Sequence, residues 1–124
     1  MLKRIWHGWT RAVDADAYEE LLRLTIFPAI VDRAIEGFLG IELLRRPLEA
    51  EVEFVTIMTF ADQAAVVRFA GPAHDAAVVP PAARKLLSRY DGHAAHYELR
   101  ATRKARAPRP HESPKSADDA GEVG

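Results

Sequence analysis

The chain has 124 residues, of which 48% are hydrophobic and 28% are charged, and it contains no cysteine. This length fits one domain with a real core, and a net charge of −1 excludes a strong electrostatic attraction to nucleic acid or to an anionic membrane. The absence of cysteine excludes a disulfide framework, thiol catalysis and thiolate metal sites, and it is typical of a cytoplasmic protein.

The first residues, MLKRIWHG, lack the apolar run of a signal peptide because His7 and Gly8 come too early. The most apolar stretch, LTIFPAIV at residues 24–31, is much shorter than the ~20 residues that cross a bilayer. We therefore expect a soluble, cytoplasmic protein with neither a nucleic-acid nor a membrane partner.

Residues 2–10 predict a strand, because the bulky residues of this segment suit a pleated surface. Alternation along a strand places Ile5, His7 and Trp9 on one face and Trp6 on the other. One tryptophan therefore belongs to each face of the predicted sheet.

The next segment, residues 11–27, predicts a helix, because its apolar residues recur at helical spacing. Asp16 begins a capping-box pattern, and Asp14 is the competing N-cap. Pro28 lacks a backbone N–H and collides with the preceding turn, so we expect this helix to end or kink near Phe27.

Residues 38–46 and 51–60 predict two strands, and residues 47–50 predict the hairpin connection between them. Asp62 is expected to cap a helix over residues 62–70, which Gly71 and Pro72 stop.

The last predicted elements are a short helix over residues 82–90, ended by Gly92, and a strand over residues 93–101. From residue 102 the chain holds prolines, charges and almost no large apolar side chain. Such a segment buries too little surface to offset its ordering entropy, so we predict a disordered tail over residues 102–124.

The predicted order β-α-β-β-α-(short α)-β indicates an α+β, ferredoxin-like domain over residues 1–101, with a four-stranded antiparallel sheet. Apolar side chains occupy both faces of the third predicted strand: Val52, Phe54, Met58 and Phe60 on one side, Val55 and Ile57 on the other. Two helices cover only one face, so we expect the other to pack against a second copy in a homodimer.

Four sequence blocks resemble the antibiotic biosynthesis monooxygenase (ABM) domain family: RIWHG, EGFLGIELLRR, EFVTIMTFADQAAVVRFAG and HYEL. The resemblance covers about residues 2–100 and implies a dimeric α/β barrel. Family members include cofactor-independent monooxygenases that oxidise polycyclic aromatic phenols to quinones, quinol monooxygenases and haem-degrading enzymes. The fold alone does not choose among these activities.

In this family, strand residues that face the helix layer line the pocket. The resemblance therefore makes His7 a candidate catalytic base, because imidazole titrates near neutral pH. His96 is the second candidate, because it shares a strand face with Glu98, which could orient it as a base. The alternative is a hydrogen-bonded interior position for His7 and a solvent edge or dimer contact for His96. Five aromatic residues are candidates for positioning a substrate ring, with core or interface packing as the alternative: Trp6, Trp9, Phe54, Phe60 and Tyr97.

In haem-degrading relatives a histidine from the second helix binds iron, which makes His74 a ligand-binding candidate. Gly71 and Pro72 are expected to displace His74 from a regular helix. Phe60 stands where these relatives carry a tryptophan, which argues against haem degradation. The histidine spacing fits no metal site, and no glycine-rich phosphate loop follows a strand, so we expect neither a metal nor a cofactor.

Three functional hypotheses follow. The first is a cofactor-independent monooxygenase that acts on a small aromatic phenol or quinol in an apolar pocket between helices and sheet. The second is a non-catalytic dimeric module that binds a small apolar ligand or mediates assembly. The third is haem binding or degradation.

Overall fold

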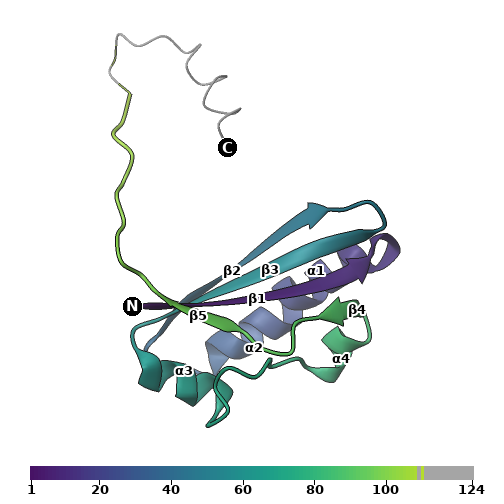
Figure 1. Cartoon of the computed structure of the whole chain (residues 1–124), viewed down its shortest axis with the longest axis horizontal. Helices are drawn as coiled ribbons and strands as arrows, with labels where there is room; N and C mark the ends of the chain where they lie inside the picture. The colour runs from purple at the N-terminus through teal and green to yellow at the C-terminus, as the bar shows by residue number, and fades with distance from the viewer. Residues whose placement is uncertain (109, 111–124) are drawn as a thin grey trace.

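An antiparallel sheet carries all of its helices on one face (Figure 1). The computed structural model describes residues 1–108 and residue 110. Within them the strands are β1 (Leu2–Arg11), β2 (Phe38–Pro47), β3 (Glu51–Phe60), β4 (Leu87–Tyr90) and β5 (Ala95–Glu98). Their order is β2-β3-β1-β4, and β5 pairs with the same edge of β1 as β4. This is the predicted α+β, ferredoxin-like arrangement, with five strands instead of four.

The helices form one layer below the sheet: α1 (Ala15–Leu21), α2 (Phe27–Asp32), α3 (Gln63–Ala70) and α4 (Pro81–Arg84). A short 3₁₀ turn (Ala12–Asp14) precedes α1. Within the described residues, no helix is long and apolar enough to cross a membrane.

Pro28 does not end the first helix. The chain forms a π-helical turn over Leu22–Ile26 and continues as α2, with Pro28 in the first turn of that segment. Proline collides with the carbonyl four residues earlier in a regular α-helix, and the wider π turn removes this collision. The helix therefore continues to Asp32 instead of ending near Phe27.

The prediction for α3 is confirmed at both ends. The Asp62 side chain accepts a hydrogen bond from the Ala65 backbone N–H at 2.9 Å. Gly71 ends the helix with a φ of +85°, a conformation that favours glycine.

The predicted short helix over residues 82–90 is wrong in its second half. Residues 87–90 form β4 and pair with β1 between Gly8 and Thr10. Without β4 and β5, β1 would be an exposed sheet edge with unpaired backbone groups. The hydrogen bonds gained by pairing residues 87–90 with β1 therefore override the helical spacing of apolar residues in this segment. The final strand is also shorter than the predicted 93–101, because only residues 95–98 pair with β1.

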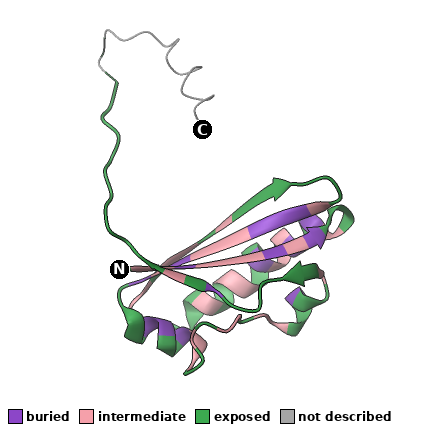
Figure 2. Ribbon diagram, in the orientation of Figure 1, coloured by how far each residue is buried: buried purple, intermediate pink, exposed green. Residues whose placement is uncertain are grey.

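The core lies between the helix layer and the side of the sheet that faces it (Figure 2). On β3, Val52, Phe54, Met58 and Phe60 are all buried on this side, as predicted. They pack against Tyr18 and Leu22 of the first helix and against Val66 and Phe69 of α3.

The other face of the sheet, which we call the open face, is mixed in character. Its centre holds partly exposed apolar side chains from three strands: Ile5, Leu44, Val55 and Ile57. Charged residues accompany them, including Lys3, His7, Glu42, Arg46 and Glu53. The face is thus less uniformly apolar than the sequence suggested. The predicted tail begins after β5; residues 109 and 111–124 lie outside the described residues, and no helix or strand is assigned to 99–108.

Candidate functional site

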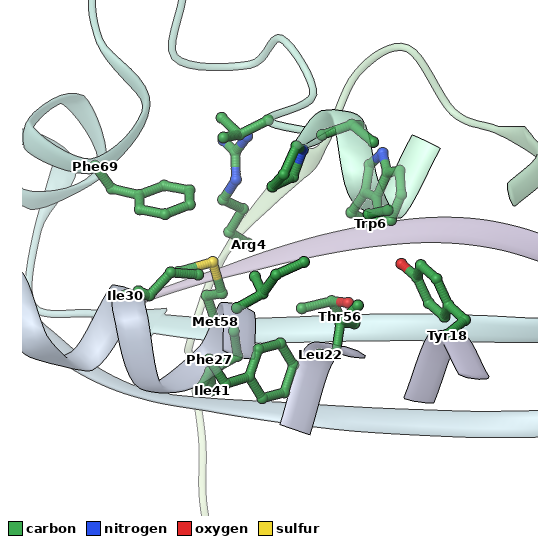
Figure 3. Close-up of a pocket in the computed structure, with 15 residues that line it drawn as sticks. Arg4, Trp6, Tyr18, Leu22, Phe27, Ile30, Ile41, Thr56, Met58 and Phe69 are labelled. Atoms are coloured by element: carbon green, nitrogen blue, oxygen red, sulfur yellow. The ribbon is translucent and has the colours of Figure 1, made fainter. Parts of the chain in front are cut away.

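A partly enclosed cavity of about 70 Å³ lies between the sheet and the helix layer (Figure 3). A volume of this size holds several water molecules or part of an aromatic ring system. Apolar side chains form most of its wall: Leu22, Ile26, Phe27 and Ile30 from the first helix, Ile41 and Met58 from the sheet, Phe69 from α3, and Val78, Val79, Pro80 and Ala83. The remaining lining residues are Arg4, Trp6, Tyr18 and Thr56.

Tyr18 brings a hydroxyl to this wall. The residue is only 2% exposed, and its ring packs edge-on against Phe54 with centroids 4.7 Å apart. Its hydroxyl points toward Thr56 and Trp6 (Figure 3). This hydroxyl has no hydrogen-bond partner among the described residues, and its oxygen is not fully enclosed by protein. Burial raises the pKa of Tyr18 well above its usual range, so the hydroxyl is a neutral donor at every physiological pH.

Trp6 forms the cavity wall on β1. Its indole Nε1 donates to the Asp91 carbonyl oxygen at 2.7 Å, which fixes the ring beside Tyr90. Gly8 leaves room for this ring, because a Cβ at that position would lie 3.0 Å from Trp6 and 2.9 Å from Leu87. The absence of a side chain at Gly8 therefore permits both Trp6 and β4 to pack here.

Arg4, two residues before Trp6 on the same face of β1, is 4% exposed. Its Nη2 donates to the Ala76 carbonyl oxygen at 2.8 Å, and its Nη1 donates to the His74 carbonyl oxygen. The guanidinium also lies 5.5 Å from the centre of the Phe69 ring. Arg4 thus joins β1 to the segment that follows α3.

His96 on β5 lies beside Arg4 in the part of the molecule nearest α3. Its Nε2 is 3.0 Å from Arg4 Nη1, and its ring centroid is 5.8 Å from that of His74. Burial, and then the positive charge of Arg4, lower the pKa of His96 below 6.5. The imidazole is therefore neutral at pH 7, and Nε2 can accept a hydrogen bond from Arg4.

The structure brings only part of the predicted site together. Trp6 lines the cavity, and His96 contacts the lining residue Arg4. Phe54 and Phe60 are fully buried behind the wall, where they pack against Tyr18 and Phe69.

Three candidates lie on the open face, which corrects the expectation that they line the pocket. His7 Nδ1 contacts Glu53 Oε2 at 2.8 Å, Trp9 lies under the Arg89 guanidinium at 3.9 Å, and Tyr97 is largely exposed. The physical reason is strand alternation: odd-numbered residues of β1 point away from the helices, and Tyr97 pairs with Lys3.

Sequence reasoning missed Arg4, Tyr18 and Thr56 as cavity residues. Tyr18 fits the helical spacing of a core residue, and a lone arginine or threonine in a strand forms no motif. The available signal was the face shared by Arg4 and Trp6, because alternate strand residues point the same way.

The comparisons with known proteins concern this fold. The sequence matches no protein-family profile, and no curated protein matches it. Several solved structures are similar, and three of them represent the range. A proposed antibiotic biosynthesis monooxygenase from Bacillus cereus has a TM-score of 0.58 and 15% identity, over 84% of this chain and 97% of that one.

The second is SnoaB, a cofactor-independent oxygenase from Streptomyces nogalater, with a TM-score of 0.53 and 20% identity, over 82% of this chain and 95% of that one. The third is the haem degrader MhuD from Mycobacterium tuberculosis with two haems bound, with a TM-score of 0.52 and 19% identity, over 84% of this chain and all of that one. The chain therefore has the fold of the ABM proteins.

Haem does not fit the residues present. His74 does not line the cavity; its ring lies against His96, and its Nδ1 is 3.4 Å from the Pro72 carbonyl oxygen. The candidate role of His74 as a haem ligand therefore has no support in this geometry.

Proposed function

We propose that this protein is a cofactor-independent monooxygenase that accepts in the cavity a phenol or quinol with a single ring or with two fused rings. The observation that carries the proposal is an apolar cavity whose wall presents the Tyr18 hydroxyl, without a protein partner, to the interior. The cavity, and not a protein group, lies beside this hydroxyl, so a substrate oxygen would supply its hydrogen-bond partner. The similarity to SnoaB, a cofactor-independent oxygenase, adds support at the level of the fold.

Each polar or aromatic group has a proposed role. Tyr18 and Thr56 hydrogen-bond a substrate oxygen, and the rings of Trp6 and Phe69 position the substrate ring. His96 is a proposed positioning residue: its neutral ring accepts a hydrogen bond from Arg4 and holds the guanidinium at the cavity wall, beside which the substrate ionises. The substrate anion then reacts with dioxygen: one oxygen atom enters the ring, and the other leaves with two substrate hydrogens as water.

Oxygen uptake with 1,4-dihydroxynaphthalene tests the proposal. We expect protein-dependent uptake of one O₂ per quinol, with 2-hydroxy-1,4-naphthoquinone as the product. Catalase added afterwards should return no oxygen, because the second oxygen atom leaves as water and not as peroxide; this separates the reaction from spontaneous oxidation. Anthrone, with three fused rings, tests the upper size limit.

Binding of the quinol without protein-dependent oxygen uptake would contradict the proposal. That result would instead identify the second hypothesis, a non-catalytic module that binds a small apolar ligand.

We also propose that the protein acts as a homodimer through the open face. Ile5, Leu44, Val55 and Ile57 form an apolar centre on that face, and the helix layer does not cover it. A two-fold axis would pair this surface with itself. Sedimentation at micromolar concentration should give the mass of two chains, and a stable monomer would contradict the dimer.

A further inference from the structure

Arg4 is the one charged residue among the described residues that line the cavity. It lines the cavity and is 4% exposed, yet no carboxylate of the described residues lies within 4.0 Å of its guanidinium. Buried arginines are nearly always paired with an anion, because an unpaired charge loses its hydration without compensation. The missing partner is therefore the feature to explain.

The groups around Arg4 are dipoles or neutral rings. Two backbone carbonyls and the neutral His96 ring accept hydrogen bonds from it, and the Phe69 ring stacks against it. Asp75 acts on Arg4 only beyond ion-pair distance, and its effect is smaller than that of burial, which lowers the Arg4 pKa. A guanidinium has five N–H donors, and these contacts use three.

We propose that the cavity binds an aromatic anion and that Arg4 pairs with its negative oxygen. This inference rests on the proposed function and deepens it: the substrate enters, or is held, as an anion, either a ring carboxylate or an ionised phenol. Both sources present the same negatively charged oxygen to Arg4. Such a contact is charge-assisted and lies in a surrounding of low polarity, where it is strong.

The test compares benzoate with benzamide, which have the same shape and differ in charge. Binding is followed by NMR titration of the Trp6 indole N–H under argon, so no turnover is involved. We expect benzoate to bind roughly 10- to 100-fold more tightly than benzamide. For the phenol arm, 4-nitrophenol should bind mainly as its yellow phenolate, at a pH where both forms coexist in solution.

The variants Arg4→Met and Arg33→Met are a matched pair. Arg33 also stacks on Phe69, at 5.4 Å, and also faces backbone carbonyl oxygens, at 3.3 and 3.4 Å, but it does not line the cavity. Arg4→Met should abolish the preference for benzoate, and Arg33→Met should retain it. Arg4→Lys, which keeps the charge with fewer donors, should give an intermediate preference.

Equal affinity of the wild-type protein for the two ligands, or tighter binding of benzamide, would overturn the inference. This comparison needs no variant, so it stands even if Arg4→Met does not fold. Failure of the proposed monooxygenase activity would leave the benzoate preference intact, whereas loss of that preference would leave oxygen uptake with a neutral quinol intact. The two failures are thus distinguishable.

Discussion

The hydroxyls of the buried residues Tyr18 and Thr10 differ in what lies beside them. The Tyr18 hydroxyl faces the cavity, whereas Thr10 Oγ1 is enclosed by protein and has no hydrogen-bond partner among the described residues. Tyr18→Phe should therefore raise KM by about 5- to 15-fold, because the substrate loses a hydrogen bond. Its free energy of unfolding should change by less than about 0.5 kcal/mol, because the folded protein loses no bond.

Thr10→Val is the control for this prediction. It replaces an unsatisfied hydroxyl with a methyl group of similar shape, so the free energy of unfolding should rise by about 1 kcal/mol while KM stays unchanged. Steady-state oxygen uptake and urea unfolding measure the two effects. An unchanged KM in Tyr18→Phe would show that the hydroxyl does not contact the substrate.

Glu53, on the open face of the sheet, makes the free energy of unfolding depend on pH. Its carboxylate accepts hydrogen bonds from His7 at 2.8 Å and Arg46 at 2.6 Å, which hold its pKa below 4.5. Because the folded pKa lies below the unfolded one, the stabilisation is complete above 4.5 and is lost as the pH falls through the folded pKa.

We therefore expect Glu53→Gln to be less stable than the wild type at about pH 6, with a difference that shrinks toward about pH 3. Urea unfolding at several pH values measures this difference. Glu51→Gln is the comparison variant. The pKa of Glu51 is also lowered, by hydrogen bonds from Ser88 and Arg89, but Glu51 lies at the exposed end of β3. A difference for Glu53→Gln that is independent of pH would contradict the argument.

Among single residues, the sequence left Trp6 between packing and a role in positioning a substrate ring, and the structure places it in the cavity wall. Alternation also separated His7 and Trp9 from Trp6, but it does not say which face the helices cover. The face that the helices cover depends on the handedness and docking of whole elements. For this reason His7 was predicted on the helix-covered face of the sheet, whereas it lies on the open face.

At the scale of elements, the loop between α2 and β2 determines how α3 packs. Gly37 has a φ of +85°, and its carbonyl accepts a hydrogen bond from Ala61 N–H at 2.7 Å. A Cβ at Gly37 would lie 2.6 Å from the Ala65 Cβ, closer than packed atoms can be. Gly37→Ala should therefore cost about 2–4 kcal/mol in the free energy of unfolding, from backbone strain and displacement of α3.

Gly71→Ala is the matched control. Gly71 has the same φ of +85°, but a Cβ there would meet no atom within 4 Å. Only the backbone penalty applies, about 1 kcal/mol. Urea unfolding of both variants compares the two costs, and equal costs would show that α3 does not pack closely against Gly37.

The longest elements were also the most predictable. Strands β2 and β3 follow from their long extended pattern, and α3 follows from its cap and stop residues. The β4 strand was missed because residues 82–90 have helical spacing, and the unpaired edge of β1 that β4 joins exists only in three dimensions. Similarly, the π turn before Pro28 depends on tertiary packing. It lets the helix continue, and the continued helix places Ile30 against the cavity.

At the scale of the whole molecule, a substitution on the open face tests the proposed dimer. Leu44 is 51% exposed in the single chain and lies at the apolar centre of that face. Leu44→Glu should leave the fold intact but weaken the dimer by at least about tenfold, because a charge would be buried at the interface. Sedimentation velocity over a concentration series measures the change.

Leu24→Glu is the control, since Leu24 is 63% exposed but lies on the helix layer. It should leave the dimer unchanged. Equal effects of the two variants, or none from Leu44→Glu, would place the interface elsewhere.

The central claim is that the cavity between helices and sheet is the ligand site. The chain has two tryptophans, Trp6 in the cavity wall and Trp9 on the open face, so their fluorescence distinguishes the two sides of the sheet. The chain has no cysteine, so the quencher 1,4-naphthoquinone forms no thiol adduct. In Trp9→Phe, which retains Trp6, we predict strong and saturable quenching; in Trp6→Phe, which retains Trp9, we predict only weak quenching proportional to concentration. Saturable quenching of Trp9 with none of Trp6 would contradict the account.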